Sequence, residues 1–128
     1  MAHLSIRIDF EPSGSALGPG MAALLERIHK MGSIRKAAAS MNMSYRKAWL
    51  LVKGMHDTFG GPVVSTEIGG ASGGGAQLTE LGQKLLKTFR DIEKIAEQAT
   101  ESEIAALSQM VRNDATPRSK LATKGRKK

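Results

Sequence analysis

The fold of this chain is decided by the stretch Gly32-Ser33-Ile34-Arg35-Lys36-Ala37-Ala38-Ala39-Ser40-Met41-Asn42-Met43-Ser44-Tyr45-Arg46-Lys47-Ala48-Trp49-Leu50-Leu51-Val52-Lys53. Ser33 can accept a hydrogen bond from the free amides of a helix that begins after it, and Ser44 can do the same for a second helix. Asn42 lies between the two helices, and asparagine tolerates the positive φ of a tight turn better than most residues. The alanines of the first helix are small enough for a second helix to cross closely. The stretch therefore predicts a helix-turn-helix.

The second helix of this motif has two different faces. Polar and basic side chains occupy its first turn and are expected to point outward: Tyr45, Arg46 and Lys47. Apolar side chains at helical spacing are expected to hold the helix against its own domain: Ala48, Trp49, Val52, Met55 and Phe59. Tyr45 has a lesser alternative as a packing residue, because aromatic side chains are few in this chain and cores use them.

Charge in this region has one sign. Between residues 27 and 53 the chain carries seven cations and no Asp or Glu: Arg27, Lys30, Arg35, Lys36, Arg46, Lys47 and Lys53. The alternative is an ordinary pair of amphipathic helices with a solvated basic face, but such a face normally mixes signs. The segregation of charge favours a polyanion as the partner.

Length and composition exclude several classes of protein. The chain has 128 residues, enough for one core with an additional helix or tail, and 41% of the residues are hydrophobic. No apolar run reaches the roughly 20 residues that a membrane span needs. The first ten residues lack the continuous apolar segment of a signal peptide. The chain contains no cysteine, which suits a reducing compartment. We expect a cytoplasmic protein without a membrane partner.

Much of the positive charge lies at the C-terminal end. The formal net charge of the chain is +7, and residues 113–128 contribute six basic residues against one acidic residue, a net +5. This segment has almost no core-forming side chains, so we predict a disordered basic tail over 113–128.

The flanks of the motif predict further elements. Apolar residues alternate with polar ones over residues 3–10, which predicts a strand, and an amphipathic helix over 21–31 should end at Gly32. Residues 63–68 and 76–78 predict two strands joined by a glycine-rich tip, an arrangement that forms a wing. The tip could instead be a phosphate-binding loop, but it lacks the Gly-Lys-Ser/Thr ending and the spacing of known nucleotide motifs.

A long helix is expected to begin at Thr79 and Glu80. Its apolar residues recur every three or four positions, at Leu81, Leu85, Phe89, Ile92, Ala96 and Ala99. The stripe could pack on the chain's own core, but some 20 residues exceed what a small domain covers, so we expect its far half to meet a second subunit. Thr100-Glu101-Ser102-Glu103 resembles a capping box and predicts a further helix.

Together these elements predict a mainly α fold with a small β wing, a winged helix-turn-helix followed by a long dimerisation helix. The expected domains are 1–80 for DNA binding, 79–112 for dimerisation and 113–128 for the basic tail. The three histidines, His3, His29 and His56, are scattered without ligand spacing. We therefore expect no metal, no cofactor and no enzymatic activity.

Several of these motifs carry a resemblance to a known family. Gly32-Ser33-Ile34, Met43-Ser44-Tyr45-Arg46-Lys47-Ala48-Trp49, the glycine-rich tip and Leu78-Thr79-Glu80-Leu81-Gly82 resemble the N-terminal DNA-binding domain of ModE-type molybdenum regulators, within the LysR-like winged-helix group. The resemblance covers about residues 4 to 95. It implies a homodimer on palindromic double-stranded DNA. The family's C-terminal molybdate-binding domain has no counterpart after residue 100, so we do not expect this chain to bind molybdate.

The expected function is sequence-specific transcriptional regulation, with a recognition helix in the major groove. The residues predicted to contact DNA are Ser33, Arg35, Lys36, Ser44, Tyr45, Arg46, Lys47, Lys53, Gly70, Gly73 and Gly74, and those predicted for dimerisation are Leu81, Leu85, Phe89, Ile92 and Ala96. One alternative is an architectural nucleoid-type protein with little sequence preference. A second is an enzyme or oxyanion-binding module that uses the glycine-rich loop.

Overall fold

The structure is a computed structural model that describes residues 2–12, 14–67 and 75–112. In chain order the elements are β1 (Ile8–Asp9), β2 (Ala16–Leu17), α1 (Pro19–Met31), α2 (Ile34–Ser40), α3 (Tyr45–Phe59), β3 (Val64–Glu67), β4 (Gly75–Leu78), α4 (Glu80–Ala99) and α5 (Glu101–Met110). Leu4–Ala99 forms one compact unit, and the described parts of Met1–His3 and Thr100–Lys128 form another. Within the described residues, no helix is long and apolar enough to cross a membrane.

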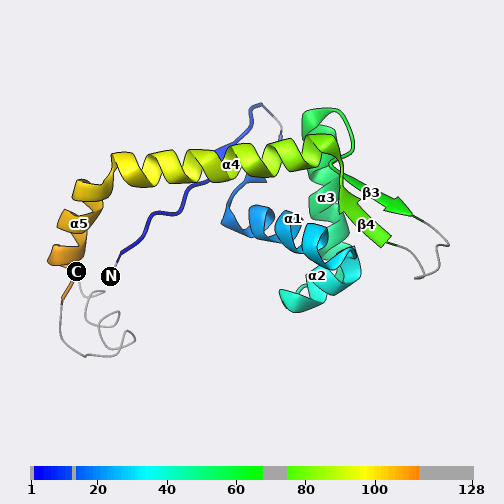
Figure 1. The fold of residues 1–128 in the computed structure, drawn as a ribbon, viewed down its shortest axis with the longest axis horizontal. Coiled ribbons are helices and arrows are strands. Elements are labelled where there is room, and N and C mark those ends of the chain that lie inside the picture. Colours follow the sequence, from blue (N-terminus) through cyan, green and yellow to red (C-terminus); the bar gives the residue numbers. More distant parts are fainter. Residues whose placement is uncertain (1, 13, 68–74, 113–128) are drawn as a thin grey trace. The chain divides into compact units, whose positions relative to one another are not determined.

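Helices α1, α2 and α3 form the centre of the larger unit, Leu4–Ala99 (Figure 1). α1 contacts α2, α4 and β4, and α2 contacts α3. The core consists of apolar side chains from each of these elements, among them Leu24, Leu25 and Ile28 of α1, Ala37 and Ala38 of α2, Val52 and Met55 of α3, and Phe89 of α4. No polar or charged side chain among the described residues is buried. The hydrophobic effect therefore supplies the main stabilisation of this unit.

The helix-turn-helix stretch folds as its sequence predicts. Ser33 accepts a hydrogen bond from the amide of Lys36, and Ser44 accepts one from the amide of Lys47, so each serine caps its helix. Asn42 has a φ of 55° in the turn between α2 and α3. Gly32 ends α1 with a φ of 67°. These four local predictions are confirmed.

β3 and β4 form an antiparallel pair that opens directly after α3. Val64 pairs with Leu78, and Glu67 pairs with Gly75. The two arms of the predicted hairpin are confirmed. Its tip, with Gly70, Gly73 and Gly74, lies outside the described residues, as does the predicted tail over 113–128.

The beginning of α4 is anchored to the segment that leads into β3. The Thr79 amide donates to the Val63 carbonyl over 3.0 Å, and the Thr79 hydroxyl donates to the Pro62 carbonyl over 2.7 Å. The same hydroxyl accepts from the Gly82 amide, which caps the helix. Gly82 is required there because a Cβ at this position would collide with the Val63 carbonyl oxygen.

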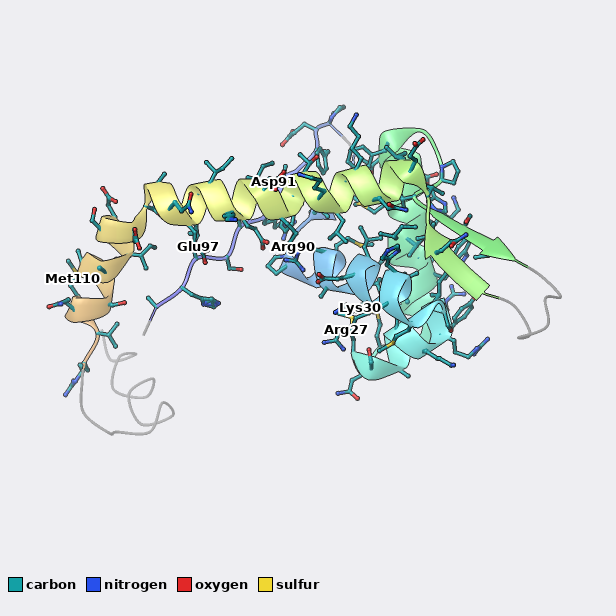
Figure 2. The ribbon with its side chains drawn as sticks, viewed as in Figure 1. Arg27, Lys30, Arg90, Asp91, Glu97 and Met110 are labelled. Atoms are coloured by element: carbon teal, nitrogen blue, oxygen red, sulfur yellow. The ribbon has the colours of Figure 1, made fainter. Side chains whose placement is uncertain are left out.

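An ion pair joins α1 to α4. Arg90 donates to Glu26 over 2.7 Å and to Glu93 over 2.9 Å, and Figure 2 shows Arg90 on the side of α4 that faces α1. The pKa of Arg90 is raised, first by its hydrogen bond to Glu93 and also by Glu26, while burial opposes the shift. The ion pair links the middle of α4 to α1.

The N-terminal segment differs in part from its prediction. Leu4, Ile6, Ile8 and Phe10 are half-buried and alternate with exposed neighbours, as expected for one buried face. Only Ile8–Asp9 is hydrogen-bonded as a strand, and its partner is Ala16–Leu17, a strand that was not predicted. The chain reverses between them through a turn in which the Gly14 amide donates to the Phe10 carbonyl.

The predicted fold class, a mainly α fold with a small β wing, in which a winged helix-turn-helix is followed by a long dimerisation helix, is wrong. The described residues contain two separate two-stranded sheets, β1–β2 and β3–β4. α4 buries Phe89 in the core of its own chain, where 1% of the side chain is exposed. The capping box predicted at Thr100 is also wrong: α5 begins there, but the Thr100 side chain makes no capping hydrogen bond.

Candidate nucleic-acid interface

The first turn of α3 forms the centre of the candidate interface. Tyr45, Arg46 and Lys47 are all exposed, as predicted. Ser44 orients this turn by accepting from the Lys47 amide over 3.0 Å. The turn before it is fixed by the Ala38 carbonyl, which accepts from the amides of Met41 and Met43, each over 2.9 Å. These backbone bonds hold the start of α3 at a fixed angle to α2.

The cations of residues 27–53 divide into two groups. Three of them are engaged: Arg27 donates to the Ser40 carbonyl and hydroxyl, Arg35 lies over the Tyr45 ring, and Lys53 pairs with Asp57 over 3.3 Å. Four have no partner among the described residues: Lys30, Lys36, Arg46 and Lys47. Arg27 and Lys30 lie on α1 near α2 (Figure 2). Lys36, Arg46 and Lys47 are exposed at the N-terminal ends of α2 and α3 and form an unneutralised basic surface.

The other predicted DNA contacts are placed as follows. Ser33 and Arg35 lie at the start of α2, close to the start of α3, because the Cζ of Arg35 is 4.5 Å from the centroid of the Tyr45 ring. Lys53 lies two turns along α3, and its charge is partly balanced by Asp57. The structure thus brings together Arg35, Tyr45 and their capped neighbours.

Apolar side chains are also exposed on α3. The exposed fractions are 43% for Tyr45, 37% for Trp49 and 51% for Leu50. The prediction that Trp49 packs against its own domain is wrong, because the buried face of α3 is centred on Ala48, Val52 and Met55. At 100° per residue Trp49 lies at the edge of that face and Leu50 nearly opposite its centre. Leu50 was not predicted as a site residue, although its helical position could have indicated its exposure.

His56 lies beside the exposed Trp49 of α3. Its Nε2 accepts from the Val64 amide over 3.4 Å, and its ring contacts the Trp49 ring edge-on with the centroids 6.1 Å apart. The pKa of His56 is lowered, mainly because burial penalises the charged ring; Lys53 adds to the effect and Asp57 opposes it. The neutral imidazole is the form that can accept the Val64 hydrogen bond.

The residues predicted for dimerisation differ in burial along α4. Leu81, Leu85 and Phe89 pack against the core of their own chain. Ile92 is 39% exposed and Ala96 is half-buried. Ile95, which was not predicted, is 65% exposed. Among the described residues of α4, the large apolar side chains that are exposed, Ile92 and Ile95, lie in its C-terminal half.

Two features bear on small ligands. No group of three His, Asp or Glu residues in the described part of the chain could hold a metal ion. A small open depression of about 180 Å³ lies between the end of α1 and β4, and its lining includes Gly32, Ser65 and Gln77. Its polar side chains are uncharged.

Comparison with known proteins shows similarity to molybdenum-related proteins. The chain is 41% identical over 83 residues to the molybdenum-pterin-binding protein MopB of Rhodobacter capsulatus, covering 65% of this chain and 31% of MopB. It is 36% identical over 93 residues to the molybdenum transport protein ModE of Azotobacter vinelandii, covering 73% of this chain and 33% of that protein. It is 33% identical over 81 residues to the DNA-binding transcriptional dual regulator ModE of Escherichia coli K12, covering 63% and 31%. No family model matches the chain.

These relatives correct two predictions. The first prediction is that the chain resembles only the DNA-binding domain of its relatives and lacks their molybdate-binding domain. The second is that the chain does not bind molybdate. Both predictions are wrong, because the similarity extends to MopB and MopA of Rhodobacter capsulatus, which are named molybdenum-pterin-binding proteins. The chain spans about a third of the length of the curated relatives it matches. Over that span it is similar both to molybdenum-pterin-binding proteins and to transcriptional regulators of the ModE type.

Proposed function

We propose that this chain is a transcriptional regulator that binds double-stranded DNA through the N-terminal half of α3. The observation that carries this proposal is the unneutralised basic surface of Lys36, Arg46 and Lys47, exposed in a segment without a single carboxylate. DNA presents one negative charge per about 1.7 Å of its axis, and its phosphates attract such a surface at long range. The function is one of binding and regulation, not of catalysis.

The geometry of the two caps fits a helix in the major groove. Ser44 fixes the start of α3, so that Tyr45, Arg46 and Lys47 extend from its first turn. Arginine donates in pairs to the O6 and N7 of guanine, and a helix N-terminus enters the groove in many helix-turn-helix proteins. We assign base contact to Arg46 and phosphate contact to Lys47. We assign contact with a flanking phosphate to Lys36, which is exposed at the start of α2.

The relatives support a regulatory role. ModE of Escherichia coli K12 is named a DNA-binding transcriptional dual regulator, and 63% of this chain aligns with it. A regulator of this kind works where the DNA is, which we propose to be the cytoplasm.

We further propose that the chain pairs through the C-terminal half of α4 alone, since the first half of the predicted dimerisation stripe packs on the core of its own chain. Ile92 and Ile95 expose apolar surface on the part of α4 beyond its contacts with the core, and Ala96 lies beside them. Apolar surface of this kind is commonly covered in an interface. A two-fold pair would present two copies of α3 to half-sites about one helical turn apart, or a multiple of it.

Selection from a random DNA pool tests the function. Enrichment of one sequence is expected, followed by tighter binding of that duplex than of a scrambled duplex of equal length and salt. Arg46→Ala should cost about 1 to 3 kcal/mol on the selected duplex. Lys94→Ala, an exposed cation on α4, is the control and should bind normally. Equal binding to selected and scrambled duplexes would instead favour an architectural role, and no binding to either would refute DNA binding.

Binding of a molybdenum-containing ligand is a second candidate function. It is favoured by the 41% identity to MopB, which is named a molybdenum-pterin-binding protein. The depression beside Gly32 offers the Ser65 hydroxyl and the Gln77 amide as hydrogen-bond donors. Titration calorimetry with molybdate at physiological salt should give a saturable signal that excess sulfate does not abolish. A signal that salt or sulfate removes would reflect only the screened attraction of anions to a cationic chain.

A further inference from the structure

We propose that Leu50, flanked by Trp49, contacts the 5-methyl groups of thymines in the major groove, so that the chain's sequence preference depends on thymine methyl groups. This inference rests on the DNA-binding function proposed above. It assigns direct base readout to apolar side chains of α3 in addition to Arg46.

The first step is the position of Leu50 on the helix. Side chains four residues apart are neighbours on a helical surface, so Arg46 and Leu50 lie side by side, and Lys53 follows one turn later. Leu50 is 51% exposed and lies nearly opposite the buried Ala48, Val52 and Met55. Leu50 is therefore exposed because of its position on α3, on the side that faces away from the core.

The second step concerns the two exposed aromatic side chains of α3. The Trp49 ring lies edge-on against His56, and the Tyr45 ring lies under the guanidinium of Arg35. Both aromatic side chains therefore already contact other side chains of the same chain. On the exposed face of α3, Leu50 is the apolar side chain that lies between Arg46 and Lys53.

The third step is the nature of the occupant. Single exposed apolar residues are ordinary on protein surfaces, but here three large ones share a helix with cations and no carboxylate before Asp57. A protein partner would have to neutralise Arg46 and Lys47 with acidic side chains while covering Leu50. The major groove offers both features at once, since thymine presents its methyl group between two phosphate backbones.

Removal of single methyl groups from the DNA tests the proposal. Each thymine of the selected duplex is replaced in turn by deoxyuridine, which removes the 5-methyl group and leaves the base pair and its hydrogen-bonding groups unchanged. Affinity is measured by fluorescence anisotropy with the full chain. At one thymine of each half-site, loss of the methyl group should weaken binding roughly fourfold, the value for one buried methyl group.

The deoxyuridine substitutions are combined with a protein variant, Leu50→Ala. It should weaken binding to the thymine duplex and make binding insensitive to the deoxyuridine substitution at that same position. Leu107→Ala is the matched control, because Leu107 is 55% exposed on α5, and it should retain the full methyl effect. Circular dichroism of Leu50→Ala should match the unmutated chain, since an exposed leucine contributes little to the core.

The outcomes separate the two proposals. A selected duplex that binds specifically but tolerates deoxyuridine at every position would overturn the thymine contact and leave DNA binding intact. Equal losses by Leu50→Ala on thymine and deoxyuridine duplexes would also overturn it and would indicate a role in protein contact. Absence of specific DNA binding by the unmutated chain would remove both proposals.

Discussion

The guanidinium of Arg35 lies over the ring of Tyr45, with Cζ 4.5 Å from the ring centroid. Arg35 belongs to the first turn of α2 and Tyr45 to the first turn of α3, so the contact joins the N-terminal ends of both helices. It also holds one cation of the region beside the exposed start of α3. An interaction of this kind at an exposed site is worth about 0.5 to 1 kcal/mol.

The first prediction is a coupling between these two residues. In a double-mutant cycle of Arg35→Met and Tyr45→Leu, the coupling in free energy of unfolding should be about 0.5 to 1 kcal/mol. Tyr45→Phe should keep the coupling, because the ring and its π-face remain. Urea denaturation of the four proteins measures it. Strict additivity of the two substitutions would show that the ring does not stabilise the guanidinium.

The second prediction concerns Gly82. Gly82→Ala should destabilise the chain by about 1 to 3 kcal/mol, since the added Cβ collides with the Val63 carbonyl and forces the start of α4 away from β3. Gly20→Ala is the matched control: nothing lies within 4 Å of its Cβ, and the change should stabilise α1 by about 0.4 to 1 kcal/mol. Thermal unfolding would contradict this geometry if both variants shifted the melting temperature in the same direction.

The third prediction is a pH dependence of stability centred on His56. Its pKa in the folded chain is lowered from 6.5, so the unfolded chain binds the proton more readily. The contribution of His56 is therefore fully present above about pH 6.5 and is lost as the pH falls through the lowered pKa. Protonation also removes the acceptor of the Val64 amide. The carboxylate of Asp57 and the ammonium of Lys53 act on the ring in opposite directions.

Urea denaturation between pH 7.5 and pH 5 measures this effect. His56→Gln keeps an uncharged side-chain acceptor and should flatten the fall in stability over this range. His29→Gln, an exposed histidine on α1, is the control and should leave the fall unchanged. An identical pH profile for His56→Gln and the unmutated chain would exclude His56 as its source.

The fourth prediction concerns the apolar surface of α4. If the chain pairs through Ile92 and Ile95, Ile92→Glu places a charge in the interface and should yield monomers at micromolar concentration in sedimentation experiments. Gln83→Glu adds the same charge at an exposed position on the opposite face of α4 and should remain dimeric. A monomeric unmutated chain would refute pairing through this surface.

The sequence predicted those features that depend on neighbouring residues. Ser33, Asn42 and Ser44 act through their own backbone conformation or an amide three residues away, so local chemistry was sufficient. The left-handed end of α1 at Gly32 follows from the absence of a side chain. The alternating burial of residues 4–10 likewise needs only a period of two along an extended chain.

Features that depend on distant partners were missed. The pairing of Ile8–Asp9 with Ala16–Leu17 requires a reversal that the local pattern does not specify. Charge counting treated Arg27 as available, but its guanidinium is engaged with Ser40, thirteen positions along the chain. In both cases tertiary geometry overrides the chemical preference of the single residue. Trp49 was missed for a different reason: it was assigned to the buried face of α3, but it lies at the edge of that face and is exposed.

Gly32 constrains how the chain could be re-engineered. Its left-handed conformation ends α1, the next residue caps α2, and its carbonyl accepts from the Ala76 amide of β4 over 2.9 Å. One peptide unit therefore sets the spacing of two helices and the register of a strand from elsewhere in the sequence. An insertion between α1 and α2, normally a tolerant place for added residues, would here displace β4 together with the basic surface.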